Sequence, residues 1–301
     1  MILFHTPAYA PLAVPLQQRA AMTAGHWHAE RFPNGEWQIH VEHDVRGEPC
    51  LVLAAISPPD SDLLTTLLLC HTLKKEGAAQ VIAFFPYLAY MRQDKDEPGR
   101  SQATAWVGRL LGASGLDDMV TVDVHSARAG QLLTIPVRSL SPAPLWAAEI
   151  RRLGWQDATL VAPDGGAVSR CEDVRRAAAM SMPIAVFAKQ RTPEGVRSTF
   201  QGSVGKRAVV VDDILDTGGT LLACCSGLLR AGAQEIIILV THGLFTGVAW
   251  QRLWTLGVKG LYCTTTLPLP AQASSSPIKQ ISIFPLCEEF FRERRQPKKL
   301  F

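Results

Sequence analysis

The stretch RAVVVDDILDTGGTLLACCSGLLRAG, residues 207–232, decides how the rest of this sequence is interpreted. Ala208 to Val211 are small or β-branched and uncharged, which is typical of a strand buried on both faces of a parallel sheet. The acids Asp212 and Asp213 end this run, a pair of glycines follows, and apolar residues recur at helical spacing from Leu221. The segment therefore predicts a strand, a tight loop and a helix.

The loop in this segment has the chemistry of a sugar phosphate site. Carboxylates at the carboxyl end of a buried strand lie in the crevice where open α/β sheets bind ligands, and they suit hydroxyl groups or a divalent cation. Glycines admit a ligand close to the backbone, and the N-terminus of a helix attracts phosphate. A structural turn capped by Asp216 or Thr217 is the alternative. The predicted ribose 5-phosphate site consists of Asp212, Asp213, Asp216, Thr217, Gly218, Gly219 and Thr220.

The run VVVDDILDTGGTL, residues 209–221, closely resembles a signature for phosphoribosyl diphosphate (PRPP). Type I phosphoribosyltransferases and PRPP synthetases share it. The resemblance favours a ligand site over a structural turn, and it leaves both enzyme classes open.

Composition excludes several classes of protein. Of the 301 residues, 47% are hydrophobic and 19% are charged, so a large core is expected and disorder is not. The net charge is +3, which favours neither a nucleic-acid partner nor a membrane surface. The chain has seven cysteines without a CxxC pair, and an N-terminus that does not resemble a secretion signal. A cytoplasmic protein without disulfides is therefore predicted.

Strand-like and helix-like segments alternate along the chain, which predicts an α/β protein with βαβ units around a parallel sheet in each of two similar halves. The proline-bearing Ser141 to Pro144 is the expected seam. The first domain spans 1–141 and is joined by a C-terminal helix within 281–301, and the second spans 142–280. The expected strands are 51–55, 81–85, 119–124, 159–162, 184–187, 208–211 and 235–240, and the expected helices are 62–76, 104–111, 145–153, 172–180 and 221–230.

Two further motifs are expected in the first domain near its strands. RFPNGEW, residues 31–37, predicts a tight exposed loop, and an ordinary hairpin is the alternative. PYLAYMRQDK, residues 86–95, follows a predicted strand, and an arginine beside an amide suits a polyphosphate. A polar surface turn is the alternative for the second motif.

Asp123 and His125 are expected on one face of a strand end, because alternate residues of a strand share a face. A metal site and a hydrogen-bonded core pair both fit this pattern.

The second domain carries two more candidate motifs. VAPDGGAVSR, residues 161–170, repeats the order of strand, acid, glycines and helix, which predicts a second anion-binding loop at Asp164. FAKQR, residues 187–191, places Lys189 and Arg191 just past a strand, where a mobile lid could neutralise a transferring phosphoryl group. A surface hairpin with two solvated cations is the alternative.

Taken together and in order, these motifs resemble those of the ribose-phosphate diphosphokinase (PRPP synthetase) family, and a phosphoribosyltransferase would share only the 209–221 signature. The resemblance implies an α/β fold of two doubly wound parallel-sheet domains of the type I phosphoribosyltransferase-like kind. It also implies transfer of diphosphate from ATP to ribose 5-phosphate with Mg²⁺, and a dimer-based homo-oligomer that can be a hexamer. It also implies roles for individual residues. These are contacts to ATP by Phe32, Asn34, Glu36, Arg92, Gln93, Asp94 and His125, magnesium ligation by His125 and Asp164, and catalysis by Lys189 and Arg191.

The chain departs from the family pattern at Gln190 and around Gly130 and Gln131. Two alternatives therefore accompany the synthetase interpretation. One is a phosphoribosyltransferase that consumes PRPP, and the other is a non-catalytic family member that regulates a true synthetase.

Overall fold

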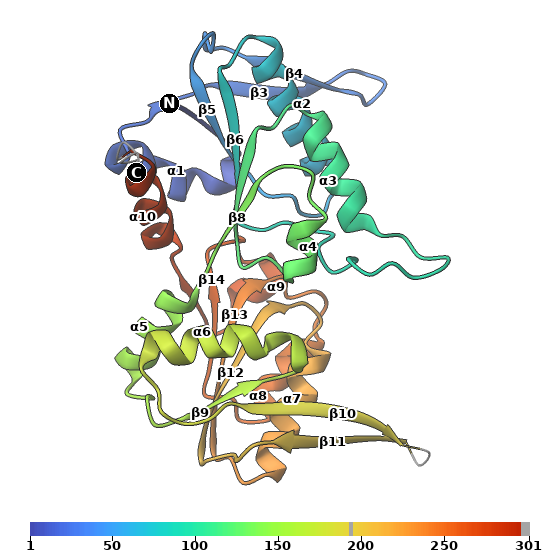
Figure 1. The fold of residues 1–301 in the computed structure, drawn as a ribbon, viewed down its shortest axis with the longest axis vertical. Helices are drawn as coiled ribbons and strands as arrows, with labels where there is room; N and C mark the ends of the chain where they lie inside the picture. Colours follow the sequence, from blue (N-terminus) through green and yellow to red (C-terminus); the bar gives the residue numbers. More distant parts are fainter. Residues whose placement is uncertain (193–194, 296–301) are drawn as a thin grey trace, which may run out of the picture. The chain divides into compact units, whose positions relative to one another are not determined.

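The computed structural model describes residues 1–192 and 195–295, and for 189–192, 195–198 and 293–295 it describes the backbone alone. The chain forms two compact units (Figure 1). One comprises Met1–Leu140 and a C-terminal segment that begins at Phe284, and the other comprises Ser141–Ile283. Each is built on a mainly parallel sheet with helices, which confirms the predicted α/β class.

The first unit contains a six-stranded sheet in the order β2-β1-β5-β6-β7-β8, and all of its paired strands are parallel. Its strands are β1 Ile2–His5, β2 Thr23–Ala24, β5 Pro49–Leu53, β6 Gln80–Phe85, β7 Asp118–Val122 and β8 Val137–Leu140. Its helices are α1 Ala10–Arg19, α2 Ser61–Lys75, α3 Ala103–Ala113, α4 Ala127–Gln131 and the C-terminal α10 Phe284–Arg295. An edge-on contact between Phe84 of β6 and Phe291 of α10 packs that helix onto this unit.

An antiparallel hairpin of β3 Trp27–Arg31 and β4 Trp37–Val41 belongs to the first unit but stands outside its main sheet. Strand β4 packs against α2. The five residues between the strands form the loop predicted from RFPNGEW, and all of them are exposed.

The second unit contains a seven-stranded sheet in the order β11-β10-β9-β12-β13-β14-β15, which is parallel except for the edge pair β10–β11. Its strands are β9 Thr159–Ala162, β10 Ala185–Thr192, β11 Gly195–Gln201, β12 Arg207–Leu215, β13 Glu235–Gly243, β14 Gly260–Thr264 and β15 Ile278–Ile281. Its α-helices are α5 Ala143–Leu153, α6 Val168–Ala178, α7 Gly219–Arg230, α8 Arg252–Thr255 and α9 Ala271–Ser274.

Strand β12 is buried on both faces. Ala208 and Val210 belong to the core cluster that contains Leu221 and Leu228 of α7. Val209 and Val211 belong to the other cluster, which includes Trp146 of α5 and Cys171 of α6. Because successive side chains of a strand point to opposite faces, an uninterrupted apolar run is what this position requires.

Five predicted strand ends were wrong. Strand β5 ends at Leu53 and β13 ends at Gly243, and the other three ends lie near candidate site residues. Strand β12 does not stop before its two acids but continues to Leu215. Strand β10 runs on to Thr192 because β11 extends it into an antiparallel hairpin. Strand β7 ends at Val122, because Asp123 has a φ of 50° that breaks the extended conformation.

All seven cysteines are free and buried, as the prediction of no disulfides requires.

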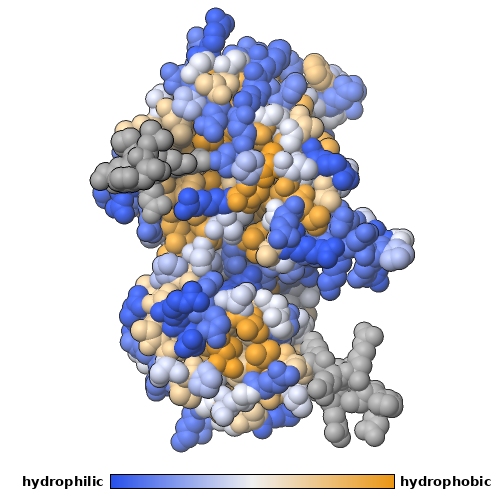
Figure 2. Space-filling view, viewed as in Figure 1, coloured by the Kyte–Doolittle hydropathy of each residue, from blue (hydrophilic) through white to orange (hydrophobic). Residues whose placement is uncertain are grey.

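Figure 2 shows hydrophobic patches on the drawn face of each unit and mainly hydrophilic residues over the end of the first unit that carries β3 and β4. In the described part of the chain, no helix combines the length and hydropathy needed to cross a bilayer.

Candidate functional site

The strand order of the second unit creates a switch point between β9 and β12. After β9 the chain adds β10 on one side, and it then places β12 on the other side. Val161 of β9 pairs with Val210 of β12, so Asp164 and Asp212 follow at the same edge of the sheet. Open α/β sheets bind ligands at the carboxyl ends of the strands beside such a point.

Two buried carboxylates and one guanidinium meet at this edge. Asp212 and Asp213 are 8% and 7% exposed. Asp213 Oδ2 lies 3.7 Å from the guanidinium of Arg170, which α6 supplies. The backbone N–H of Asp213 donates to Asp212 Oδ1 at 3.0 Å. The sheet thus holds both carboxylates in place before any ligand binds.

The pKa of Asp212 is strongly raised in this site. Burial, the charge of Asp213, a hydrogen bond with the Asp213 side chain and the charge of Asp164 together raise the pKa of Asp212 to about 8, and Arg170 opposes this shift. A group with this pKa is protonated in the folded protein at neutral pH. A divalent cation or a cationic ligand beside these carboxylates would favour the ionised form.

We expect Asp212→Asn to stabilise the ligand-free protein at alkaline pH. The folded-state pKa of Asp212 lies above the unfolded value near 3.8, so its contribution to stability is complete below about pH 4 and is lost as the pH rises through about 8. The variant lacks this loss, and at pH 9 its free energy of unfolding should exceed that of the wild type by at least about 1 kcal/mol, the value of one pKa unit. Urea titrations at pH 5 and pH 9 measure this, and equal pH slopes in both proteins would contradict it.

The loop after β12 leads into the exposed N-terminus of α7. Gly218 has a φ of 88°, and an added Cβ would lie 2.8 Å from the Cα and Cβ of Trp250, so only glycine fits there. Thr217, Gly219 and Thr220 are exposed, and among the described residues no side chain caps this helix. Its first N–H groups have no partner within the helix and are available to an anion.

The second predicted anion loop is arranged differently from the expectation. Asp164 Oδ1 accepts hydrogen bonds from the backbone N–H groups of Gly166 at 2.8 Å and Ala167 at 3.2 Å. The amides that were expected to bind an anion therefore donate to the carboxylate of Asp164 instead. Its side chain is exposed, and this fixed carboxylate oxygen is a suitable neighbour for a cation.

Lys189 and Arg191 lie within β10 rather than past its end, opposite Ser198 and Val196 of β11. Their backbone therefore forms the hairpin that was the alternative to a lid. The side chains of both residues lie outside the described part of the structure, so their predicted catalytic roles stay predictions.

In the first unit, the predicted ATP residues after β6 are tied to the loop that follows β7. Asp94 is 7% exposed, and its Oδ2 accepts a hydrogen bond from Ser126 Oγ at 2.6 Å. The carbonyl of Asp94 accepts another from Arg128 Nε at 2.9 Å. Arg92 and Gln93 are exposed, whereas Asp94 positions the loop.

His125 lies in this loop, two residues before α4 begins at Ala127. Ser126 caps α4 by accepting from the N–H of Ala129 at 2.9 Å. The expectation that Asp123 and His125 share a strand face was wrong, because the strand ends before both residues and Asp123 adopts a positive φ. The structure places His125 near Asp94, because its neighbour Ser126 donates a hydrogen bond to the Asp94 carboxylate.

The remaining predicted residues lie on the hairpin loop. Phe32 is 48% exposed, and Asn34 Oδ1 accepts from the N–H of Glu36 at 3.2 Å. The N–H of Phe32 donates to the carbonyl of Glu36 at 2.9 Å and closes the loop. The loop thus has a defined shape and an exposed aromatic ring, which suits stacking on a planar ligand.

Four residues that contact predicted site residues were missed in the sequence: Ser126, Arg128, Arg170 and Trp250. Ser126 could have been found, because serine is a preferred residue at the N-cap of a helix. Arg170 belongs to the motif at residues 161–170, but its ion pair with Asp213 depends on how α6 packs beside β12. Trp250 lies far along the chain from Gly218 and carries no local signal.

Two family models match the chain. The N-terminal domain of ribose phosphate pyrophosphokinase matches residues 1–115, and a phosphoribosyl transferase domain matches residues 143–247. The second match confirms the predicted kind of domain.

Curated relatives span most of the chain. A protein named ribose-phosphate pyrophosphokinase from Bacillus caldolyticus is 30% identical over 95% of this chain and 92% of its own length. A protein of the same name from Maricaulis maris is 34% identical over 91% of this chain and 89% of its own length. The crystal structure of phosphoribosylpyrophosphate synthetase from Mycobacterium smegmatis superposes with a TM-score of 0.87 at 29% identity, and it covers 97% of this chain and 98% of that one.

Proposed function

The chain belongs to the ribose-phosphate pyrophosphokinase family, and we propose that it transfers the β,γ-diphosphoryl group of ATP to the 1-hydroxyl of ribose 5-phosphate. The products are PRPP and AMP. The observation that carries this proposal is the likeness to pyrophosphokinases over both domains, since a phosphoribosyltransferase would share the second domain alone.

Ribose 5-phosphate binds at the switch point of the second unit in this proposal. The carboxylates of Asp212, Asp213 and Asp216 accept hydrogen bonds from ribose hydroxyls, and the amides from Thr217 to Thr220 hold the 5-phosphate. The buried position of the first two acids and the exposed start of α7 support this assignment. The acids lie at the end of β12 and in the short loop after it, and the amides lie in the same loop and at the start of α7.

ATP binds through the first unit. Arg92 and Gln93 contact its phosphates, while Asp94 holds their loop and that of His125 in place. Phe32, Asn34 and Glu36 contact the adenine base from a neighbouring subunit, which makes the protein a dimer-based homo-oligomer. The exposure of this loop supports the assignment.

Magnesium is the proposed cofactor, with His125 and Asp164 as protein ligands. The site at the switch point of the second unit fits a cation, because burial and the neighbouring carboxylates of Asp213 and Asp164 raise the pKa of Asp212 and a cation would favour its ionised form. When bound, Mg²⁺ neutralises the triphosphate and orients it.

The reaction needs alignment and charge stabilisation rather than a protein nucleophile. The 1-hydroxyl oxygen forms a bond to the β-phosphorus and loses its proton to water, while the bond from that phosphorus to the α,β-bridging oxygen breaks and AMP leaves with the electron pair. Lys189 and Arg191 stabilise the charge on the transferring group in this proposal.

The proposed location of the protein is the reducing cytoplasm, and the free, buried thiols agree with it.

Purified protein should form AMP from ATP only when ribose 5-phosphate and Mg²⁺ are both present. Chromatographic detection of AMP and PRPP, with each component omitted in turn, measures this. A phosphoribosyltransferase would instead consume PRPP with a base and would need no ATP. Absence of AMP under every metal and phosphate condition would support the regulatory alternative, which the relatives do not favour.

A further inference from the structure

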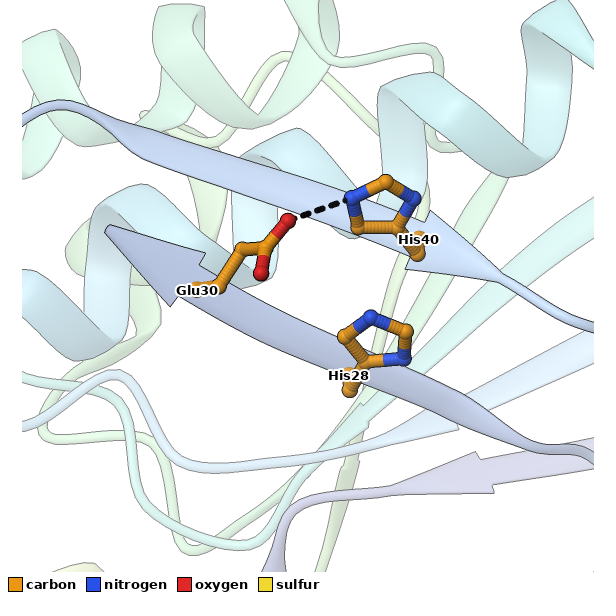
Figure 3. A group of neighbouring side chains, drawn as sticks. All are labelled: His28, Glu30 and His40. Atoms are coloured by element: carbon orange, nitrogen blue, oxygen red, sulfur yellow. Dashed lines mark hydrogen bonds and ion pairs between the residues drawn. The ribbon is translucent and has the colours of Figure 1, made fainter. Parts of the chain in front are cut away.

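One face of the β3–β4 hairpin and of the residue that follows it gathers two histidines and two glutamates, and Figure 3 draws both histidines and one of the glutamates. His28 of β3 is directly opposite His40 of β4 in the antiparallel register. Glu30 lies two residues after His28, and Glu42 lies two residues after His40. Because alternate residues of a strand share a face, the pairing brings these side chains together.

The four side chains already contact one another. His40 Nε2 lies 2.8 Å from Glu30 Oε1, and His28 Nδ1 lies 3.0 Å from Glu42 Oε1. The two imidazole rings are stacked, with centroids 4.7 Å apart and planes 16° from parallel. Figure 3 shows the bond between Glu30 and His40 and the ring of His28 beside them.

Three of these residues can supply ligands to one ion. One ligand atom from each of His28, Glu30 and His40 lies within 4.8 Å of the other two. Bonds of about 2.0–2.2 Å in a tetrahedral site place ligand atoms about 3.3 Å apart. The side chains are 52%, 57% and 40% exposed, so small rotations in solvent can close the difference.

Glu42 is suited to orient His28. Its carboxylate holds Nδ1, which leaves Nε2 of the same ring for a metal. A carboxylate on the distal nitrogen of a histidine ligand is the usual support of zinc-binding histidines. The two carboxylates also give this face the negative charge that attracts a divalent cation.

We propose that His28, Glu30 and His40 bind a divalent transition metal ion of the zinc class, with Glu42 orienting His28 and water as the fourth ligand. Two imidazoles with one carboxylate and an open position suit zinc, nickel or copper. Magnesium prefers oxygen ligands, so two imidazoles at one site favour a transition metal ion over magnesium.

Metal binding would cross-link two strands beside the loop of residues 32–36. At present the hairpin is held by its ladder, by packing of β4 on α2, and by Arg31 stacked over the Trp37 ring at 4.1 Å. A bound ion adds a bridge two residues before the loop begins. We expect it to slow hydrogen exchange of the hairpin amides.

The test is a calorimetric titration of full-length, EDTA-treated protein with zinc chloride in excess MgCl₂, so that oxygen-rich sites are occupied by magnesium. The proposal expects one tight zinc site per chain. His28→Ala and His40→Ala should each weaken it at least about 100-fold, and Glu42→Gln about 10-fold, the lower end of the loss seen for such supporting residues. Lowering the pH from 7.5 to 5 should weaken binding, because protons compete for imidazole.

His71→Ala is the matched control, because it removes an exposed histidine of α2 and should leave the isotherm unchanged. His40→Gln, with thermal melts in EDTA, shows that a loss of binding is not a loss of folding. A tight zinc site that survives His28→Ala and His40→Ala would place the metal elsewhere and overturn the proposal. Wild-type binding only at millimolar zinc would also overturn it and leave a surface ion-pair cluster.

Discussion

Replacing Gly218 by alanine is expected to destabilise the second unit and to remove most ribose 5-phosphate binding. The backbone conformation at φ 88° costs an alanine about 1–3 kcal/mol. The added methyl would also lie 2.8 Å from Trp250, so the loop must move away from η3 Ala249–Gln251. That movement displaces the amides proposed to hold the phosphate, and kcat/KM for ribose 5-phosphate should fall at least about 100-fold, the scale expected from misplacing a substrate by 1 Å.

Gly219→Ala is the matched control for stability. A Cβ at this position meets nothing within 4 Å, and the residue opens α7, where alanine favours the helix. Urea unfolding should show a loss for the first variant and none for the second. If Gly218→Ala is as stable as the wild type, the steric argument fails. If it is destabilised but keeps its KM for ribose 5-phosphate, the loop does not hold the phosphate.

Replacing Lys189 by alanine is expected to lower kcat for AMP formation at least about 10³-fold, the lower end of what a single cation contributes to phosphoryl transfer. The physical reason is that charge develops on the transferring group only in the transition state, so the KM values for ATP and ribose 5-phosphate should change much less. Initial rates at varied substrate concentrations separate the two parameters. Lys189→Arg, which keeps the charge, should recover part of the rate.

Lys206→Ala is the matched control, because it removes an exposed lysine of the same unit just before β12. Its kcat should equal that of the wild type. Loss of activity in both variants would show that net charge matters rather than Lys189 itself. Full activity of Lys189→Ala would remove the lysine from the mechanism.

The alternation of sheet and helix was predictable because buried parallel strands have a strong sequence pattern. The apolar run of β12 must pack on two layers, and the two core clusters show why no polar residue interrupts it. The hairpin loop of residues 32–36 was predictable for a similar reason, since a proline and a glycine between two strand-like segments favour a turn.

Local signals failed where distant partners decide the conformation. Strand β10 is longer than predicted because β11 pairs with it, and this pairing is not visible in either segment alone. The strand partner of Asp212 and the ion pair of Asp213 with Arg170 likewise depend on elements distant in the sequence. The prediction for the amides near Gly166 failed for a local reason, because the carboxylate of Asp164, two residues before Gly166, accepts the hydrogen bonds that were predicted to bind an anion.

The seven buried thiols make each unit a reporter of its own opening. Burial raises the pKa of Cys70 in the first unit and of Cys171 and Cys263 in the second to about 12, so these thiols are protonated and shielded from reagents in the folded state. Alkylation then measures how often the surrounding core unfolds. Mass spectrometry can assign each modified peptide to its unit, so the separate stabilities of the two halves can be followed in the native sequence without an introduced label.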